Sequence, residues 1–199
     1  GGGDDLAHLL SAGVLGAEGG MPGSLRPKLP MEPVLVGAEG VPDYDDDEGG
    51  TACILGPSAR VAIRQALSPS HALRDWVLRY STECHGCSLR TAYSRLSHGA
   101  GPTILMVLDA NGHRFGAFAT HTWAPSHRYF GTGESFLFKA HPGAPTVFPW
   151  TGANSHFQLA QHDSMAMGGG GHFGLWLDEA FEYGSSGPCT TYGNLPLGS

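Results

Sequence analysis

One short segment carries three residues that could bind a metal or react as nucleophiles. Cys84 and Cys87 are separated by two residues, and His85 lies between them. A structural zinc site needs four ligands, usually supplied as two pairs, and the sequence holds no second Cys-x-x-Cys pair. We therefore expect free thiols and no metal ligand. A reactive thiol needs a pKa lowered by cations or by a helix N-terminus. Cys87 precedes a predicted helix and is the best candidate for a minor thiol-based activity.

A glycine-rich run formally matches a dinucleotide-binding fingerprint, because Gly169, Gly171 and Gly174 have the G-x-G-x-x-G spacing. That fingerprint works only where a helix follows, so that its N-terminus faces the pyrophosphate. Residues 173–177 read Phe-Gly-Leu-Trp-Leu and are typical of a strand. We therefore expect no nucleotide and no other cofactor, and interpret these glycines as devices of backbone geometry.

Carboxylates, serines and histidines are present, but they do not form a recognisable catalytic arrangement. The sequence has no G-x-S-x-G elbow. Glu134, in the Gly-Thr-Gly-Glu run at 131–134, could act as a general base. Such a carboxylate more often fastens loops by accepting backbone N–H bonds, and Asp178 is similarly placed. We predict a non-enzymatic protein with no catalytic residues.

The charge is unevenly distributed along the chain. Residues 1–50 hold ten acidic and two basic residues, whereas residues 51–199 hold eight acidic and nine basic ones. The second segment is nearly neutral and lacks the excess of positive charge that would neutralise phosphates. Nucleic-acid binding through a basic surface is therefore not expected. No apolar run reaches the length of about 18 residues needed to span a bilayer. Together with free cysteines, this predicts an intracellular, cytoplasmic protein, with a cilium or an organelle as alternatives.

Composition divides the chain near residue 50. Residues 1–50 contain twelve glycines, five prolines and an acidic cluster at 43–48. Such a segment cannot bury enough apolar surface to offset the entropy lost on ordering. We predict an extended arm or linker over 1–50 that lacks regular structure and packs little against a domain over 51–199.

The second segment predicts two short helices and about nine antiparallel strands. One helix spans 58–67, with Ser58 as its N-cap and Ser68-Pro69 as its stop, and a second follows Ser88. The predicted strands are 76–80, 103–108, 115–120, 134–139, 146–150, 155–160, 163–167, 173–178 and 188–192. This pattern indicates a mixed α/β, mainly β fold, a two-sheet antiparallel β-sandwich flanked by short helices. The predicted core comprises Trp76, Leu105, Val107, Phe118, Phe136, Phe138, Trp150, Phe157, Leu175 and Leu177.

Several runs in the second segment resemble the TLDc family and occur in the order that this family shows. They lie at 76–82, 85–89, 101–105, 115–118, 129–138, 150–154, 167–178, 184–186 and 189–194. The resemblance covers about residues 55–197 and implies a sandwich of the predicted kind. The family usually continues into a further strand, so the final strand is apparently missing and one sheet edge is expected to be open. The chain also has Asn194-Leu-Pro-Leu where the family commonly has Asn-Glu-Pro-Leu.

The resemblance implies a protein-binding domain linked to oxidative-stress resistance, with the vacuolar-type proton ATPase as a partner. The candidate residues for partner binding are those that match the family's turns: Gly131, Gly133, Glu134, Gly152, Asn154, Gly168, Gly169, Gly170, Gly171, Gly174, Gly184, Ser185, Ser186, Cys189 and Asn194.

Two alternatives stay open from the sequence. In one, the acidic N-terminal arm holds the chain as a structural subunit of a large ciliary, axonemal or organellar assembly. In the other, the chain is an enzyme or scavenges peroxide directly through Cys84, Cys87 or Cys189.

Overall fold

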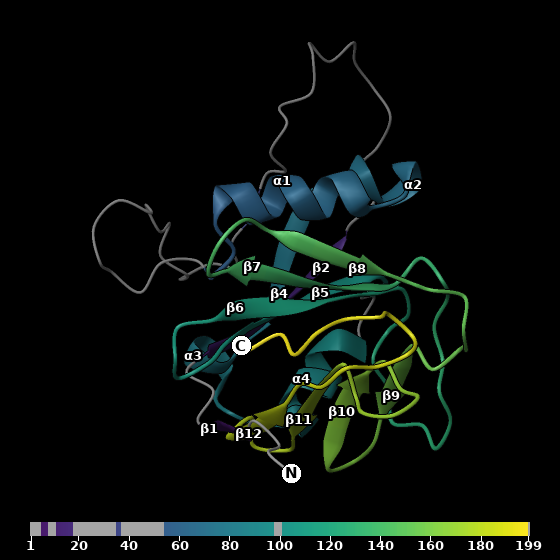
Figure 1. Ribbon diagram of the computed structural model, residues 1–199. Helices are drawn as coiled ribbons and strands as arrows, with labels where there is room; N and C mark the ends of the chain where they lie inside the picture. Colours follow the sequence, from purple (N-terminus) through teal and green to yellow (C-terminus); the bar gives the residue numbers. More distant parts are fainter. Residues whose placement is uncertain (1–4, 8–10, 18–34, 37–53, 98–100, 199) are drawn as a thin grey trace.

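The computed structural model describes residues 5–7, 11–17, 35–36, 54–97 and 101–198, and it shows two β-sheets stacked face to face (Figure 1). The seven-stranded sheet has the order β3 (Leu35–Val36), β4 (Trp76–Ser81), β2 (Ser11–Ala17), β5 (Thr103–Leu108), β6 (Arg114–Ala119), β7 (Phe136–His141) and β8 (Thr146–Pro149). The five-stranded sheet has the order β1 (Asp5–Ala7), β12 (Tyr183–Ser185), β11 (Leu175–Asp178), β10 (Ser164–Met167) and β9 (Gln158–Ala160). The predicted antiparallel sandwich is confirmed, with β3–β4 as a parallel pair.

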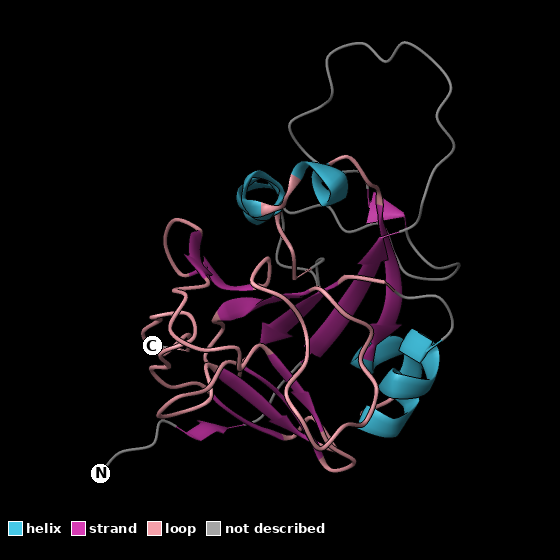
Figure 2. Ribbon diagram, turned by 90° about the vertical axis from the view of Figure 1, so that its right-hand side faces the viewer, coloured by secondary structure: helices cyan, strands magenta, loops and turns pink. Residues whose placement is uncertain are grey.

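Four short helices flank the sheets: α1 (Pro57–Ala66), α2 (Pro69–Ala72), α3 (Thr82–His85) and α4 (Leu89–Ser97). Figures 1 and 2 show α1 and α2 over the outer face of the seven-stranded sheet. Helix α4 packs its apolar face against the core between the sheets, and the Tyr93 hydroxyl donates to the Ser164 carbonyl at 3.2 Å. Both predicted helices are confirmed as α1 and α4, although α1 has Gly56 rather than Ser58 as its N-cap. Pro57 explains this shift, because a proline is favoured in the first turn of a helix.

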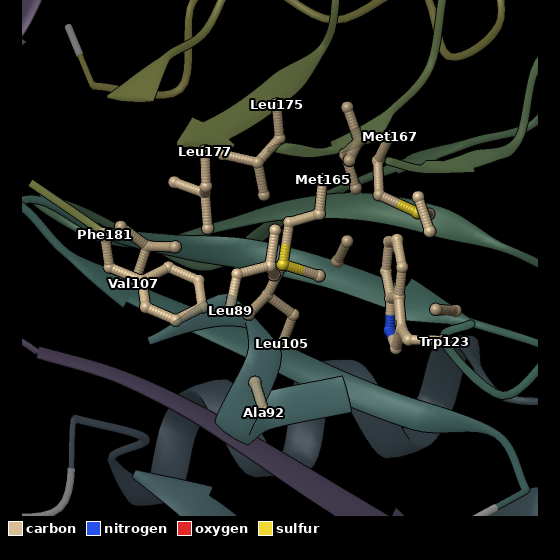
Figure 3. Packing of buried hydrophobic residues seen from close by; sticks show 14 of the residues in the cluster. Leu89, Ala92, Leu105, Val107, Trp123, Met165, Met167, Leu175, Leu177 and Phe181 are labelled. Atoms are coloured by element: carbon tan, nitrogen blue, oxygen red, sulfur yellow. The ribbon is translucent and has the colours of Figure 1, made fainter. Parts of the chain in front are cut away.

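Strand β5 separates two hydrophobic clusters and is buried on both of its faces. Leu105 and Val107 point into the core between the sheets, where Met165, Leu175 and Leu177 meet them (Figure 3). Ile104 and Met106 belong to the second cluster, which α1 covers. This arrangement explains why 103–108 is a continuous apolar run instead of an alternating one.

Three details of the sequence-based prediction are wrong. Residues 188–192 form turns rather than a strand, with one isolated bridge between Gly171 and Cys189, and strand β12 was not predicted. Trp150 was expected in the core but is 42% exposed, whereas the other nine predicted core residues are buried. A tryptophan is long enough to place one edge against the protein and leave the other in water.

The prediction that residues 1–50 lack regular structure and pack little against the domain is also wrong. Strand β2 lies between β4 and β5, antiparallel to both, and β1 adds to the edge of the five-stranded sheet. The average composition of a fifty-residue segment conceals short uncharged runs such as Ser-Ala-Gly-Val-Leu-Gly-Ala at 11–17. The acidic cluster at 43–48 lies outside the described residues.

We expect Val14→Pro to destabilise the whole domain, because Val14 pairs with Tyr80 on one side and Leu105 on the other. Proline removes an N–H donor from the ladder and leaves a buried carbonyl unpaired, at a cost on the order of 2–3 kcal/mol. Urea unfolding followed by tryptophan fluorescence measures the change. Val36→Pro in the edge strand β3 is the control, with a smaller expected loss. Equal stability of Val14→Pro and the unmodified chain would contradict the central position of β2.

Candidate functional site

Four loops without regular secondary structure converge at one corner of the sandwich. They follow β6, β8, β10 and β12, and they span residues 120–135, 150–157, 168–174 and 186–198. Most of the candidate residues lie in these loops. Their backbone groups cannot all pair in a β-ladder, so side chains supply many of the missing partners. The candidates outside the corner are Gly184 and Ser185, which lie in β12.

A buried hydroxyl joins three of the loops. Thr191 Oγ1 accepts a hydrogen bond from the Gly169 N–H at 2.9 Å and lies 2.8 Å from Asn154 Oδ1, to which it can donate. The Asn154 side chain also donates to Thr190 Oγ1 at 2.8 Å and accepts from the His156 N–H at 3.0 Å. Thr191 is fully buried. Asn154 therefore fastens loops together: both lone pairs of its side-chain oxygen and one of its two amide protons are used in these bonds.

A second buried group holds the last loop against the five-stranded sheet. The Cys189 thiol donates to Asn194 Oδ1 at 3.0 Å, and Asn194 Nδ2 donates to the carbonyls of Gly187 and Leu195, each at 2.9 Å. Ser186 Oγ donates to the Gly174 carbonyl at 2.6 Å. Burial raises the pKa of the Cys189 thiol, which keeps it protonated and poorly nucleophilic.

The glycine tetrad 168–171 packs against this group. Gly168 has φ +80°, and a Cβ at this position would lie 2.6 Å from Cys189 Sγ. This confirms the prediction that at least one of these glycines serves the backbone geometry. The expected strand after Gly174 is also confirmed, since β11 begins at Leu175. No helix N-terminus is available there for a phosphate.

Glu134 and Trp150 are two of the exposed residues of the corner, and Leu195 in the last loop is exposed as well. The Trp150 ring lies against Gly133, so that a methyl group on Gly133 would overlap the ring. Its Nε1 donates to the Asn154 carbonyl at 2.7 Å. The Glu134 side chain is 52% exposed, with His71 Nε2 at 3.7 Å. The prediction was that Glu134 accepts backbone N–H bonds, and among the described residues no backbone N–H is seen to donate to its carboxylate. Asp178 does so, from Glu182 and Tyr183.

The sequence located several glycine turns, although Gly184 lies in strand β12, and it missed Thr191 and the exposed edge of Trp150. Gly131 and Gly152 both occupy turns with positive φ. Thr191 lies within the Cys-Thr-Thr-Tyr-Gly-Asn run at 189–194, so its position beside recognised motif residues was the signal that could have identified it.

The cysteine pair of the first half lies away from this corner. Cys84 is on α3, Cys87 follows it, and both are exposed. His85 Nδ1 accepts the Ser81 N–H at 3.1 Å, and burial, followed by the charge of Arg95, lowers its pKa. Across the described residues, no group of three or more His, Cys, Asp or Glu side chains is arranged to hold a metal ion.

Comparison with known proteins identifies a domain family for most of the chain. The TLDc domain family matches residues 50–199. Nuclear receptor coactivator 7 of Mus musculus is 43% identical over 120 residues, which cover 60% of this chain and 13% of that protein. Oxidation resistance protein 1 of Rattus norvegicus is 38% identical over 145 residues, which cover 72% of this chain and 17% of that protein. The chain thus corresponds to less than a fifth of the length of these relatives.

We expect Gly168→Ala to lower the free energy of unfolding by more than about 1 kcal/mol. The added methyl group meets Cys189 Sγ, and the positive φ disfavours any side chain. Gly143→Ala is the matched control, because Gly143 has φ +84° but no atom within 4 Å of an added Cβ. Chemical denaturation should show a larger loss for Gly168→Ala than for Gly143→Ala. Equal losses would mean that the contact with Cys189 contributes nothing.

We expect the native protein to show two fast-reacting thiols, Cys84 and Cys87, and one slow thiol, Cys189. Cys189 is buried with a raised pKa, so it should react only after unfolding. Ellman's reagent measures the rates in a Cys53→Ser background, first in buffer and then in denaturant. A fast third thiol under native conditions would contradict the buried position of Cys189.

Proposed function

The chain belongs to the TLDc domain family, and we propose that it is a non-enzymatic protein-binding domain with a role in protection against oxidative stress. The oxidation resistance proteins among its relatives support this role. By the resemblance of its motifs, we further propose the vacuolar-type proton ATPase as a partner.

One observation carries the non-enzymatic proposal: the polar side chains of the motif residues are used to hold loops. Asn154, Ser186 and Asn194 bond to backbone groups or to neighbouring threonine and cysteine side chains of the loops. Cys189 is buried, and burial raises its pKa. A catalytic site needs a nucleophile and a base within reach of each other and of a substrate. The corner instead presents a fixed surface around Glu134 and Trp150, as a docking domain does.

The proposed partner implies where in the cell the chain acts. Among the described residues, no helix is both long and apolar enough to cross a membrane. We propose a cytoplasmic site of action, where the chain would meet the cytoplasmic part of the proton pump.

The proposal is tested by direct binding of the full chain to purified vacuolar-type ATPase. We expect saturable binding by biolayer interferometry and a change in the pump's ATPase activity as the chain is titrated. Glu83→Gln, an exposed acid on α3, serves as a control for nonspecific charge effects. Absence of binding with the chain at tens of micromolar would contradict the pump as partner.

The alternative, a structural subunit held by its N-terminal segment, requires a different variant. Deletion of residues 1–50 would remove β2 from the sheet, so any loss of binding would be confounded by loss of the fold. Changing the acids of the 43–48 cluster to their amides leaves β2 intact. Loss of partner capture in that variant favours the structural subunit, and unchanged capture favours the docking surface of the corner.

A further inference from the structure

A hollow of about 490 Å³ lies beside the corner, and Glu134 is one of the residues that line it. One end of it is formed by Ala66, Leu67 and Ser68, where helix α1 ends. Its walls include Phe136 and Val147, and Glu134 contributes the one carboxylate among the lining residues. The volume falls within the range of roughly 300–1,000 Å³ that is typical of ligand sites. Figure 1 shows α1 lying over β7 and β8, the strands that supply the walls.

Two independent sources of negative potential act on this hollow. The Glu134 side chain is half exposed, and within the described part of the chain its one ionisable neighbour inside 4 Å is the imidazole of His71, at 3.7 Å. The C-terminal end of α1, which carries the partial negative charge of the helix dipole, borders the same space. The nearby basic residues Arg64 and His71 do not line the hollow. The position therefore favours a cation.

A fixed aromatic ring stands next to the carboxylate. Trp150 is held by its bond to the Asn154 carbonyl, by an edge contact with Phe157 at 5.4 Å, and by Gly133. It nevertheless remains 42% exposed. Trp150 does not itself line the hollow, but Gly133, which the ring contacts, and Pro149, which precedes Trp150, both do. The ring therefore borders the hollow on the side of Gly133. A rigid aromatic face beside a carboxylate suits a guanidinium group, which stacks on rings and bonds carboxylates in a bidentate manner.

We propose that this hollow, formed by the end of α1, Glu134 and the strands β7 and β8, binds an arginine side chain from an extended segment of a protein partner. The apolar walls Phe136 and Val147 would cover the methylene stem, and Glu134 would accept the guanidinium. The proposed contact is a guanidinium group bound by a carboxylate, and it does not depend on which protein supplies the arginine. It rests on the proposed function only in that the occupant is a protein.

The test uses two blocked tripeptides, acetyl-Leu-Arg-Leu-amide and its citrulline counterpart, which has nearly the same shape and no charge. Nitrogen–proton NMR of the full chain follows the Gly133 amide and the Trp150 indole N–H. We expect saturable shifts with the arginine peptide that weaken as salt is added. We expect at least tenfold weaker binding of the citrulline peptide. Equal binding of the two peptides, or no shift at 10 mM peptide, overturns the proposal.

Glu134→Gln keeps the side-chain shape and removes the charge, and Glu182→Gln, an exposed acid in the turn after β11, is the matched control. We expect at least a tenfold loss of arginine-peptide affinity in the first variant and none in the second, with unchanged thermal unfolding of both. The proton pump separates the two proposals. Pump binding without selective binding of the arginine peptide overturns the arginine site and leaves the proposed function intact. Peptide binding without pump binding supports the arginine site and removes that partner.

Discussion

The buried contact of the Thr191 hydroxyl with Asn154 and Gly169 determines where the loops of the corner lie. Thr191 and the Gly169 N–H are buried and Asn154 is half-buried, and a buried polar group left without a partner costs about 1–3 kcal/mol. The loops therefore settle where every member of the group is bonded. The backbone carbonyl of Asn154 accepts the hydrogen bond of the Trp150 indole N–H. The hydrogen-bond network around Thr191 thus orients a ring that is partly exposed. Order at the surface of this corner depends on polar contacts beneath it.

The elements that sequence patterns predicted are those whose burial is set by local periodicity. Strand β5 was recognisable because both of its faces are covered, and α4 because its apolar residues recur at helical spacing. Residues 188–192 were wrongly predicted as a strand. The side chains of Thr190 and Thr191 bond this segment to neighbouring loops, in place of the backbone ladder of a strand. Strand β2 escaped prediction for another reason. Its place between β4 and β5 is a pairing across a long stretch of sequence, which no local pattern reports.

The candidate site shows the same limit. Glycine turns can be located from sequence because few other residues tolerate positive φ. Whether a polar residue is occupied or free depends on partners that are distant in sequence, such as Thr191 for Asn154 or Gly174 for Ser186. The prediction from sequence consequently grouped Glu134 with residues whose side chains hold the loops together. Asn154, Ser186 and Asn194 make side-chain hydrogen bonds within the protein, whereas Glu134 keeps a half-exposed carboxylate.

This division affects how any loss of partner binding should be interpreted. A change at Gly168, Asn154 or Cys189 alters the loops and thereby the ring and carboxylate that they present, so its effect on binding follows from its effect on the fold. Glu134 is different, because within the described residues its carboxylate takes no part in the hydrogen bonds that fasten the loops. The glycine and asparagine positions thus act as positioning residues for a surface whose contacts are made by others. A partner would recognise the charge of Glu134 and the face of Trp150, and the buried network would fix how far apart the two are held.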